Sequence, residues 1–299
     1  MEAKNSQFNR ENLTMKKLSI VIVSYNVGKY LKNCLESINK TAGSLQPEII
    51  VVDNNSTDDT DTILKTNFPQ LQVTTNSKNC GFAKAANMGM KISQGEFVAL
   101  LNPDTVVLDC AFTGMLEYLE NNPGVGITGP KLIDPDGSLQ YSCRSFPSWS
   151  TYFSNRQSLL NRIFPSNKWS KKYLLKEKDH QQIQEVDWIS GCCLLLRKKM
   201  LEEIGYLDKD FFMYIEDVDL ARRAKSKNWK VVYYPPAQLI HFKSQSVIQN
   251  KIGMLIEHHR SMYKYYLKHY PKNWLVKAGV FSAVFLRLGS CVLGMKLKS

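Results

Sequence analysis

Two carboxylates follow apolar segments in the first half of the sequence. Asp53 comes directly after residues 48–52, and Asp104 ends an Asn-Pro-Asp triplet after residues 97–101. A carboxylate at the end of a buried strand can accept hydrogen bonds from a nucleobase or ribose, which fits Asp53, or ligate a hard divalent ion such as Mg²⁺ or Mn²⁺, which fits Asp104. Each residue is also compatible with an ordinary turn or a helix cap. From the residues alone, both alternatives stay open.

Three acids fall within four residues further along the chain. Glu216, Asp217 and Asp219 follow the apolar and aromatic run 211–215. Burial raises the pKa of a carboxylic acid and a nearby cation lowers it, so such a cluster can supply a general base. The alternative is an acidic first turn of a helix, favoured by the helix dipole and by pairing of Asp219 with an arginine three or four residues later. Both hold if the outer acids are structural and Asp217 is the chemical group.

A histidine, His241, stands at the end of an apolar stretch. A neutral imidazole is a good metal ligand, but a single histidine in such a place is more often an ordinary core or surface residue. It becomes a candidate ligand only in the company of other ligating side chains.

The elements that must carry these residues alternate between strands and helices over the first hundred residues. Residues 18–24 are continuously apolar and β-branched apart from two serines, as in a strand buried on both faces of a parallel sheet. Further strands are expected at 48–52, 71–74 and 97–101, and helices at 30–38, 59–65 and 82–93. This alternation predicts βαβ units in an α/β fold, with ligands bound beyond the carboxyl ends of the strands.

The second half of the chain has a weaker pattern. Residues 138–184 are rich in aromatic and basic side chains without a clear period, which suggests a mobile or partner-facing segment. A strand is expected at 186–197 and a helix from about Glu216. Another strand at 230–234 should stop at Pro235-Pro236, because proline cannot donate to a strand ladder.

The composition separates a nearly neutral body from a basic end. The 299 residues are 43% hydrophobic, which allows a sizeable core and excludes a disordered or fibrous protein. The net charge is +12, yet residues 222–299 hold fifteen Lys or Arg and one acid, whereas residues 1–221 hold 24 bases and 26 acids. A helical, tyrosine-rich segment at 248–270 lies in the basic part. This asymmetry points to an anionic partner, either a membrane surface or a nucleic acid.

The segment 274–295 favours the membrane surface. It is rich in apolar residues, but Lys277 and Arg287 interrupt it, and a spanning helix needs about twenty apolar residues. We expect this segment to lie in the interface of an anionic membrane, held by its basic residues. A core helix or a dimer contact is the alternative. No nucleic-acid partner is expected, because the apolar stretch has no use in that role.

The cysteines and the N-terminus indicate a reducing compartment. Seven cysteines without a CxxC pair suggest neither a disulfide framework nor a zinc site. Residues 1–16 form a polar leader that lacks the apolar core of a secretory signal. We therefore expect a cytoplasmic protein, peripherally associated with the cytoplasmic membrane.

Six short motifs occur in order along the chain. They are Ser-Ile-Val-Ile-Val-Ser-Tyr-Asn at 19–26, Val-Val-Asp-Asn-Asn-Ser-Thr-Asp at 51–58, Asn-Cys-Gly-Phe-Ala-Lys-Ala-Ala-Asn at 79–87, Leu-Leu-Asn-Pro-Asp-Thr at 100–105, Trp-Ile-Ser-Gly at 188–191 and Tyr-Ile-Glu-Asp-Val-Asp-Leu at 214–220. In this order they resemble glycosyltransferase family 2, particularly its rhamnosyltransferase-like members. The resemblance implies a GT-A glycosyltransferase domain at 17–246, with a mainly parallel sheet flanked by helices, and leaves a basic helical region at 247–299.

The same resemblance implies roles for individual residues. Ser24, Asn26 and Asp53 would line the nucleoside pocket, with Asp53 near the base, and Asn87 would help to hold the donor. Asp217 would be the catalytic base of an inverting transfer from a nucleotide-diphospho-sugar.

A divalent ion, Mg²⁺ or Mn²⁺, is the implied cofactor. Asp104 would end the DxD-type metal motif of the family, and His241 would be a second metal ligand. The first position of the motif is Asn102, which leaves one carboxylate for the ion and an amide to contact the donor.

The function implied is transfer of a sugar, with rhamnose suggested by the subgroup, to a hydroxyl of a cell-surface polysaccharide or lipid-linked oligosaccharide precursor. The alternative is a catalytically inactive protein that binds a nucleotide-sugar or a polyanion. Such a protein would be free to lose Asp104 or Asp217, and this chain keeps both. A nucleotidyltransferase would need a basic, glycine-rich loop after the first strand, whereas residues 24–28 hold no basic residue.

Overall fold

The first part of the chain forms the expected alternation of strands and helices. The computed structural model describes residues 17–147, 168–242, 251–270 and 274–296, so the leader at 1–16 lies outside the described residues. The first elements are β1 (Leu18–Ser24), α1 (Gly28–Ala42), η1 (Gly43–Leu45), β2 (Glu48–Asp53), α2 (Thr60–Asn67), β3 (Gln72–Thr75), α3 (Phe82–Ile92) and β4 (Phe97–Leu101). Strands β2 and β4 both pair with β1 in parallel, and β3 adds in parallel to β2.

The second part extends the same sheet. Its elements are β5 (Thr105–Val107), α4 (Ala111–Asn121), β6 (Val125–Ile133), β7 (Leu139–Gln140), β8 (Cys143–Arg144), α7 (Lys168–Tyr173), β9 (Gln184–Glu185), β10 (Trp188–Ile189), β11 (Cys193–Arg197), α8 (Lys198–Ile204), α9 (Glu216–Ser226) and β12 (Lys230–His241). The main strand order is β3-β2-β1-β4-β11-β6-β12-β5. Strand β11 lies antiparallel between β4 and β6, so the predicted parallel sheet is a mixed one with parallel parts on both sides.

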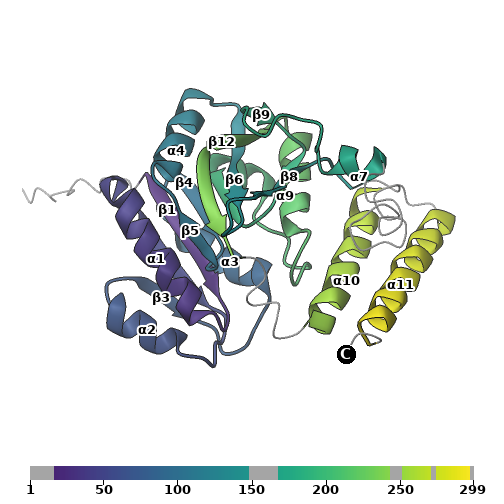
Figure 1. Cartoon of the computed structure of the whole chain (residues 1–299), viewed down its shortest axis with the longest axis horizontal. Coiled ribbons are helices and arrows are strands. Elements are labelled where there is room, and N and C mark those ends of the chain that lie inside the picture. Colours follow the sequence, from purple (N-terminus) through teal and green to yellow (C-terminus); the bar gives the residue numbers. More distant parts are fainter. Residues whose placement is uncertain (1–16, 148–167, 243–250, 271–273, 297–299) are drawn as a thin grey trace, which may run out of the picture.

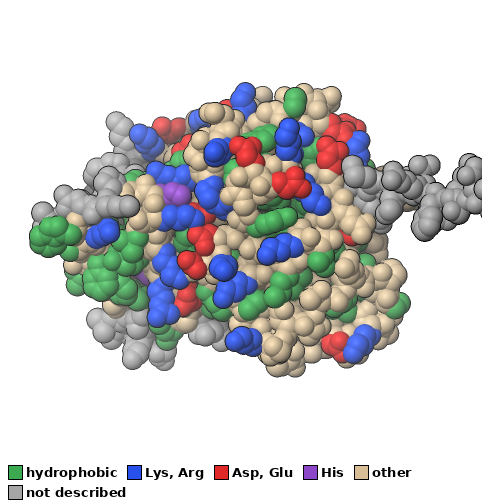
Figure 2. Space-filling view, turned by 180° about the vertical axis from the view of Figure 1, so that it is seen from behind, with side chains coloured by type: hydrophobic (Ala, Val, Ile, Leu, Met, Phe, Trp, Pro, Cys, Tyr) green, Lys and Arg blue, Asp and Glu red, His purple; other side chains and the backbone are tan. Residues whose placement is uncertain are grey.

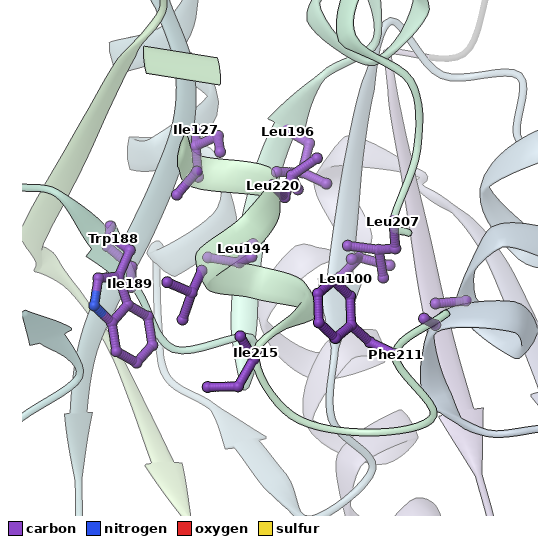
Figure 3. Packing of buried hydrophobic residues seen from close by; sticks show 14 of the residues in the cluster. Leu100, Ile127, Trp188, Ile189, Leu194, Leu196, Leu207, Phe211, Ile215 and Leu220 are labelled. Atoms are coloured by element: carbon purple, nitrogen blue, oxygen red, sulfur yellow. The ribbon is translucent and has the colours of Figure 1, made fainter. Parts of the chain in front are cut away.

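Two hydrophobic cores lie on opposite faces of this sheet. In β1, Val21 and Val23 belong to one core while Ile20 and Ile22 belong to the other, because successive side chains point to opposite faces. Helices α3 and α9 cover the face with Val21 and Val23, and α1 and α4 cover the face with Ile20 and Ile22 (Figure 1). Figure 3 shows the core that contains Val21 and Val23, where Leu220 of α9 packs near the leucines of β11. Each fully buried aliphatic side chain contributes about 1.5–3 kcal/mol.

Strand β12 does not stop at the proline pair, so this prediction is wrong. The strand runs from Lys230 to His241, and its parallel register with β6 shifts between Tyr234 and Gln238. This irregularity leaves the prolines out of the ladder, so their missing N–H groups cost no ladder hydrogen bond. The strand then resumes and brings His241 opposite Thr105 of β5.

The segment without a clear period is partly ordered by long-range strand pairing. Strand β7 pairs with β6, β8 with β10, and β9 with β12. Strands β7, β8, β9 and β10 have two residues each, too few to produce a period in the sequence. The interpretation as a mobile segment is therefore wrong for these parts, whereas a partner-facing role stays a prediction. Residues 148–167 lie outside the described residues.

Two helices form the described part of the C-terminal region. They are α10 (Lys251–His269), which corresponds to the helix predicted at 248–270, and α11 (Trp274–Lys296). Both lie beside the sheet domain (Figure 1), and apolar side chains gather over this end of the molecule in Figure 2. Three large apolar residues of α11 are well exposed, namely Trp274, Phe281 and Leu286. Among the described helices, none combines the length and the apolar character needed to cross a membrane.

Candidate active site

The carboxyl ends of β1 and β2 bring Ser24 and Asp53 side by side. The two residues are partners in the parallel register, and both are buried. The Oδ2 atom of Asp53 accepts the Ser56 N–H at 3.2 Å. The Asp53 Oδ1 and Ser24 Oγ atoms are buried, and neither has a hydrogen-bond partner within the described residues. Unsatisfied buried oxygens cost free energy, so a ligand that donates a hydrogen bond would be favoured here.

Asn26 connects the loop after β1 to the loop after β2. Its backbone has a positive φ of 53°, a region that asparagine tolerates better than most residues. Its Oδ1 atom accepts the Thr57 N–H at 2.6 Å, and its own N–H donates to Ser56 Oγ at 2.9 Å. These contacts hold the two loops of the predicted nucleoside pocket together.

Asn87 fixes a loop from the second half of the chain. Its Nδ2 donates to the Leu207 carbonyl at 2.7 Å, and its Oδ1 accepts the Leu207 N–H at 3.0 Å. Nearby, the Phe82 N–H donates to the Phe212 carbonyl at 2.7 Å, and a Cβ on Gly81 would lie 2.5 Å from that carbonyl oxygen. The motif that contains Gly81 and Asn87 thus anchors the loop that leads to the acidic cluster.

Asp104 and His241 lie close together at the end of the sheet. The distance from His241 Nε2 to Asp104 Oδ1 is 3.4 Å, and the Phe242 N–H donates to the Asp104 carbonyl at 2.9 Å. The other ring nitrogen, His241 Nδ1, lies 2.9 Å from Gln140 Oε1. His241 therefore lies beside a second potential metal ligand, which is the condition for treating it as a candidate ligand.

This pair fits a hard divalent ion. In the described part of the chain no group of three or more His, Cys, Asp or Glu side chains is placed to hold a metal. Mg²⁺ and Mn²⁺ do not need such a group, because they bind through one or two protein ligands together with substrate phosphates and water. The carboxylate oxygen suits both ions, and the imidazole nitrogen suits Mn²⁺ better than the harder Mg²⁺.

A strained turn presents the acidic cluster. Tyr214 and Ile215 have positive φ values of 67° and 72°, and a β-branched residue rarely adopts this region. Such strain costs about 1–3 kcal/mol per residue and concentrates at functional sites. Helix α10 braces the turn, because Ser261 Oγ donates to the Met213 carbonyl at 2.9 Å and the His258 ring packs edge-on against Tyr214.

Asp217 follows this turn in the first turn of α9. Its Oδ2 accepts the Gly191 N–H at 2.7 Å, and its Oδ1 accepts the Val218 N–H at 2.8 Å. Burial raises the pKa of Asp217, although these two hydrogen bonds and the positive charge of Arg144 oppose the shift. A half-buried carboxylate with a raised pKa is suited to accept a proton.

Glu216 is more deeply buried than its neighbour Asp217. Burial and then the charge of Asp217 raise the pKa of Glu216 well above its usual range. Its Oε2 atom is buried without a hydrogen-bond partner in the described part of the chain. Two adjacent buried carboxyl groups do not both ionise readily, so we assign the retained proton to Glu216.

Asp219 is an ion-pair centre within the fold. It is fully buried, and its carboxylate contacts Arg223 Nε at 2.8 Å, Lys268 Nζ at 2.8 Å and His269 Nε2 at 2.6 Å. Burial would raise its pKa, but these hydrogen bonds lower the pKa of Asp219 to about 2. The pairing partner is Arg223, one of the two arginines expected, whereas Arg222 donates to Tyr265 Oη at 2.9 Å. Asp219 therefore joins α9 to α10.

Backbone hydrogen bonds of two consecutive residues, Gly191 and Cys192, connect the predicted metal motif to the acidic cluster. Gly191 donates its N–H to Asp217, and the carbonyl of the next residue, Cys192, accepts the Asn102 N–H at 2.8 Å. The Asn102 carbonyl in turn accepts Thr105 Oγ1 at 2.8 Å. The sequence assigns no role to the motif at 188–191. In the structure, Gly191 of this motif holds Asp217 beside the strand end that carries Asn102 and Asp104.

Two residues near the site were missed by the sequence argument. Gln140 contacts His241, and the Arg144 guanidinium lies over the Trp188 ring, with its carbon 5.1 Å from the ring centroid. Both belong to the stretch without a clear period, where no signal in a single sequence distinguishes them from surface residues.

The sequence matches the family Glycosyl transferase family 2 over residues 19–205. Among curated proteins, it is 30% identical over 268 residues to the N-acetylglucosaminyl-diphospho-decaprenol L-rhamnosyltransferase of Mycobacterium tuberculosis, covering 86% of both chains. It is also 25% identical over 269 residues to the low-salt glycan biosynthesis hexosyltransferase Agl10 of Haloferax volcanii, covering 89% of this chain and 76% of that protein.

Solved structures share the fold at low sequence identity. The mannosyltransferase PcManGT of Pyrobaculum calidifontis, in complex with GDP-Man and Mn²⁺, aligns with a TM-score of 0.57 at 15% identity and covers 95% of this chain and 76% of its own. GalNAc-T7 with UDP, GalNAc and Mn²⁺ aligns with the same TM-score and identity, and covers 77% of this chain and 44% of its own. These likenesses concern the fold alone.

Proposed function

The chain belongs to glycosyltransferase family 2, with a GT-A fold and glycosyltransferase activity, and on this basis we propose that it transfers a sugar with inversion. The proposed donor is a nucleotide-diphospho-sugar. The proposed acceptor is a hydroxyl group of a lipid-linked oligosaccharide or cell-surface polysaccharide precursor. The observation that carries the proposal is a pair of backbone hydrogen bonds, one from the Gly191 N–H to Asp217 and one from the Asn102 N–H to the Cys192 carbonyl. They set Asp217, a carboxylate with a raised pKa, beside the strand end of Asn102 and Asp104.

The donor nucleoside is proposed to bind at the ends of β1 and β2. The buried Asp53 Oδ1 and Ser24 Oγ atoms would be satisfied by a base that donates one hydrogen bond and accepts another. A pyrimidine with an N–H between two carbonyl groups meets this requirement, so thymidine and uridine diphosphates both fit. Asn26 shapes the pocket by joining its two loops, and Asn87 acts on the donor side by anchoring the loop at Leu207. The likeness to an L-rhamnosyltransferase supports rhamnose as the sugar.

Asp217 is proposed as the base. In an inverting reaction, the acceptor hydroxyl attacks the anomeric carbon opposite the leaving diphosphate while a carboxylate takes its proton. The N–H groups of Gly191 and Val218 orient the two oxygens, and the raised pKa brings the carboxylate closer to the proton affinity it needs. Glu216, held neutral by burial, keeps negative charge from accumulating beside the base.

A divalent ion is proposed to bind at Asp104 and His241, near Asn102. When bound, Mg²⁺ or Mn²⁺ would act as a Lewis acid that offsets the charge of the departing diphosphate. Asp104 would contribute a carboxylate oxygen, and His241 would contribute Nε2. Asn102 would contact the donor without adding a second negative charge.

The region 247–299 is proposed to hold the enzyme peripherally on the cytoplasmic face of the cytoplasmic membrane. The exposed Trp274, Phe281 and Leu286 of α11 would enter the interface, where tryptophan is favoured. Residues 222–299 carry fifteen bases and one acid, and each base near an anionic leaflet adds about 1 kcal/mol. A membrane position would suit an acceptor carried on a lipid diphosphate, as in the name of the mycobacterial relative.

A screen of donor hydrolysis tests the proposed reaction. Purified full-length protein is incubated with dTDP-rhamnose, UDP-sugars and GDP-sugars in Mg²⁺ or Mn²⁺, and release of the nucleoside diphosphate is measured. We expect turnover with a thymidine or uridine donor that increases when a lipid-linked acceptor is added. Absence of both binding and turnover for every pyrimidine donor would contradict the proposal.

A further inference from the structure

Gln140 makes a set of hydrogen bonds around the backbone and ring of His241. The glutamine lies in the two-residue strand β7 and is 8% exposed. Its Nε2 donates to the His241 carbonyl at 2.8 Å and to Asp134 Oδ1 at 2.8 Å, with the Ile133 carbonyl at 3.4 Å. Its Oε1 lies 2.9 Å from His241 Nδ1. One buried side chain therefore contacts both the main chain and the imidazole of the same residue.

The partners decide which way the Gln140 amide points. Two backbone carbonyls and a carboxylate surround the Nε2 position, and all three can only accept a hydrogen bond from it. Turning the amide over would place its oxygen against these three oxygens. The NH₂ group must therefore lie on their side, and the oxygen must face His241.

This orientation fixes the hydrogen on the imidazole. An amide oxygen is an acceptor, so His241 Nδ1 must carry a hydrogen to bond with Gln140 Oε1. A neutral imidazole then has its lone pair on Nε2. That atom lies 3.4 Å from Asp104 Oδ1, so an acceptor nitrogen faces a carboxylate oxygen. A cation that both atoms ligate would satisfy the pair.

We propose that Gln140 is a positioning residue that holds His241 in the Nδ1–H tautomer, so that Nε2 and Asp104 are both presented to the divalent ion of the transferase reaction. The inference rests on the proposed function, because that function supplies the reason for an ion at this place. It explains why a buried amide from β7 reaches the end of β12. Groups that fix a metal-ligating histidine through its second nitrogen typically change metal affinity about 10- to 100-fold when removed.

Methionine at position 140 separates this role from simple packing. Gln140→Met keeps the length of the side chain and removes the acceptor for Nδ1–H. The hydrogen should then move to Nε2, where Asp104 Oδ1 accepts a hydrogen bond from it. Nε2 then has no lone pair with which to bind the ion. Asp134→Asn keeps Gln140 and its acceptor oxygen, and the new amide oxygen still accepts from Gln140 Nε2. It is therefore the control variant, in which the tautomer should not change.

The experiment reads the tautomer directly. Nitrogen NMR of the full-length protein with ¹⁵N-labelled histidine is recorded without metal at about pH 8, where neutral imidazole is favoured over imidazolium. His241→Gln identifies the signals among the five histidines. We expect a protonated Nδ1 and a pyridine-like Nε2 in the wild type and in Asp134→Asn, and a protonated Nε2 in Gln140→Met. Mn²⁺, titrated alone and with UDP, should broaden the Nε2 signal, with affinity about 10- to 100-fold weaker in Gln140→Met.

Three results would overturn the inference. The first is a wild-type His241 with its hydrogen on Nε2, which needs no variant to observe. The second is the same tautomer in the wild type and in Gln140→Met. The third is a loss of Mn²⁺ affinity without a change of tautomer, which would indicate that Gln140 only supports β7. The tautomer is measured without donor, acceptor or metal, so failure of the transfer assay leaves this result unchanged.

Discussion

Replacing Asp219 with asparagine should destabilise the folded protein far more than replacing an exposed aspartate that also pairs with a base four residues later. Asp219 is fully buried and pairs with Arg223 four residues later, as well as with Lys268 and His269 of α10. Asp61 pairs with Lys65, also four residues later, but both side chains are largely exposed. Asp61→Asn is therefore a matched control that differs in burial and in the number of partners.

The pKa of Asp219 gives the magnitude. Its three partners overcome the effect of burial and lower the pKa to about 2, whereas an unfolded aspartate has a pKa of about 3.9. A lowered pKa stabilises the fold above the unfolded pKa, so the ionised carboxylate contributes about 2–3 kcal/mol near neutral pH, and this is lost as the pH falls from about 4 to about 2. Removing the carboxylate also leaves the buried charges of its partners uncompensated, so the free energy of unfolding should fall by about 3–5 kcal/mol in total.

Denaturant unfolding measures the effect. Urea titrations of the wild type, Asp219→Asn and Asp61→Asn are compared at about pH 7 and about pH 3. At pH 7 the free energy of unfolding should fall by about 3–5 kcal/mol in Asp219→Asn and by less than about 0.5 kcal/mol in Asp61→Asn. At pH 3 the gap between the wild type and Asp219→Asn should narrow by about 1 kcal/mol. Equal stability of the two variants, or a gap that does not depend on pH, would refute the reasoning.

Three further predictions concern binding. Asp53→Asn should weaken binding of dTDP or UDP about 10- to 100-fold, as measured by calorimetry, because the neutral amide forms a weaker hydrogen bond to the base than the carboxylate does. Unchanged affinity would show that Asp53 does not bind the base. EDTA should suppress transfer, and full activity in EDTA would contradict the metal role of Asp104 and His241. Asp104→Ala should weaken donor binding when Mn²⁺ is present and leave it unchanged when Mn²⁺ is absent. A chain that ends after Tyr270 should lose binding to anionic liposomes in a flotation assay, and high salt should loosen the intact protein; liposome binding that survives the truncation would assign the contact elsewhere.

The N-terminal half of the sheet could be predicted from the sequence because its elements are continuous in the sequence and, in most cases, five residues or longer. Strands buried on both faces give uninterrupted apolar runs, and helix α3 was placed to within one residue of its end. Asp53 and Asp104 could be placed at strand ends because polar residues follow each apolar run. The pattern also located Asp217 at the start of α9.

The other half of the site depends on long-range contacts that leave no period in the sequence. The register shift in β12 carries His241 past two prolines to Asp104, and no local rule predicts a strand that continues there. Gln140 lies 101 residues from His241 in the chain, and Asp217 lies 26 residues from Gly191. A two-residue strand gives too few positions for a pattern, so only its pairing with β6 explains why Gln140 is buried.

Transfer by two variants of the acidic cluster tests the role of Asp217 most directly. Single-turnover rates are measured for the wild type, Asp217→Asn and Glu216→Gln with the donor identified by the screen, and nucleotide-sugar affinity is measured alongside. Asp217→Asn should lower the rate about 10²- to 10⁴-fold with affinity within a few fold of the wild type, because a base acts in the transition state. Glu216→Gln replaces one neutral group by another and should retain a rate within a few fold of the wild type. Near wild-type turnover in Asp217→Asn, or a larger loss in Glu216→Gln, would contradict the assignment of Asp217 as the base.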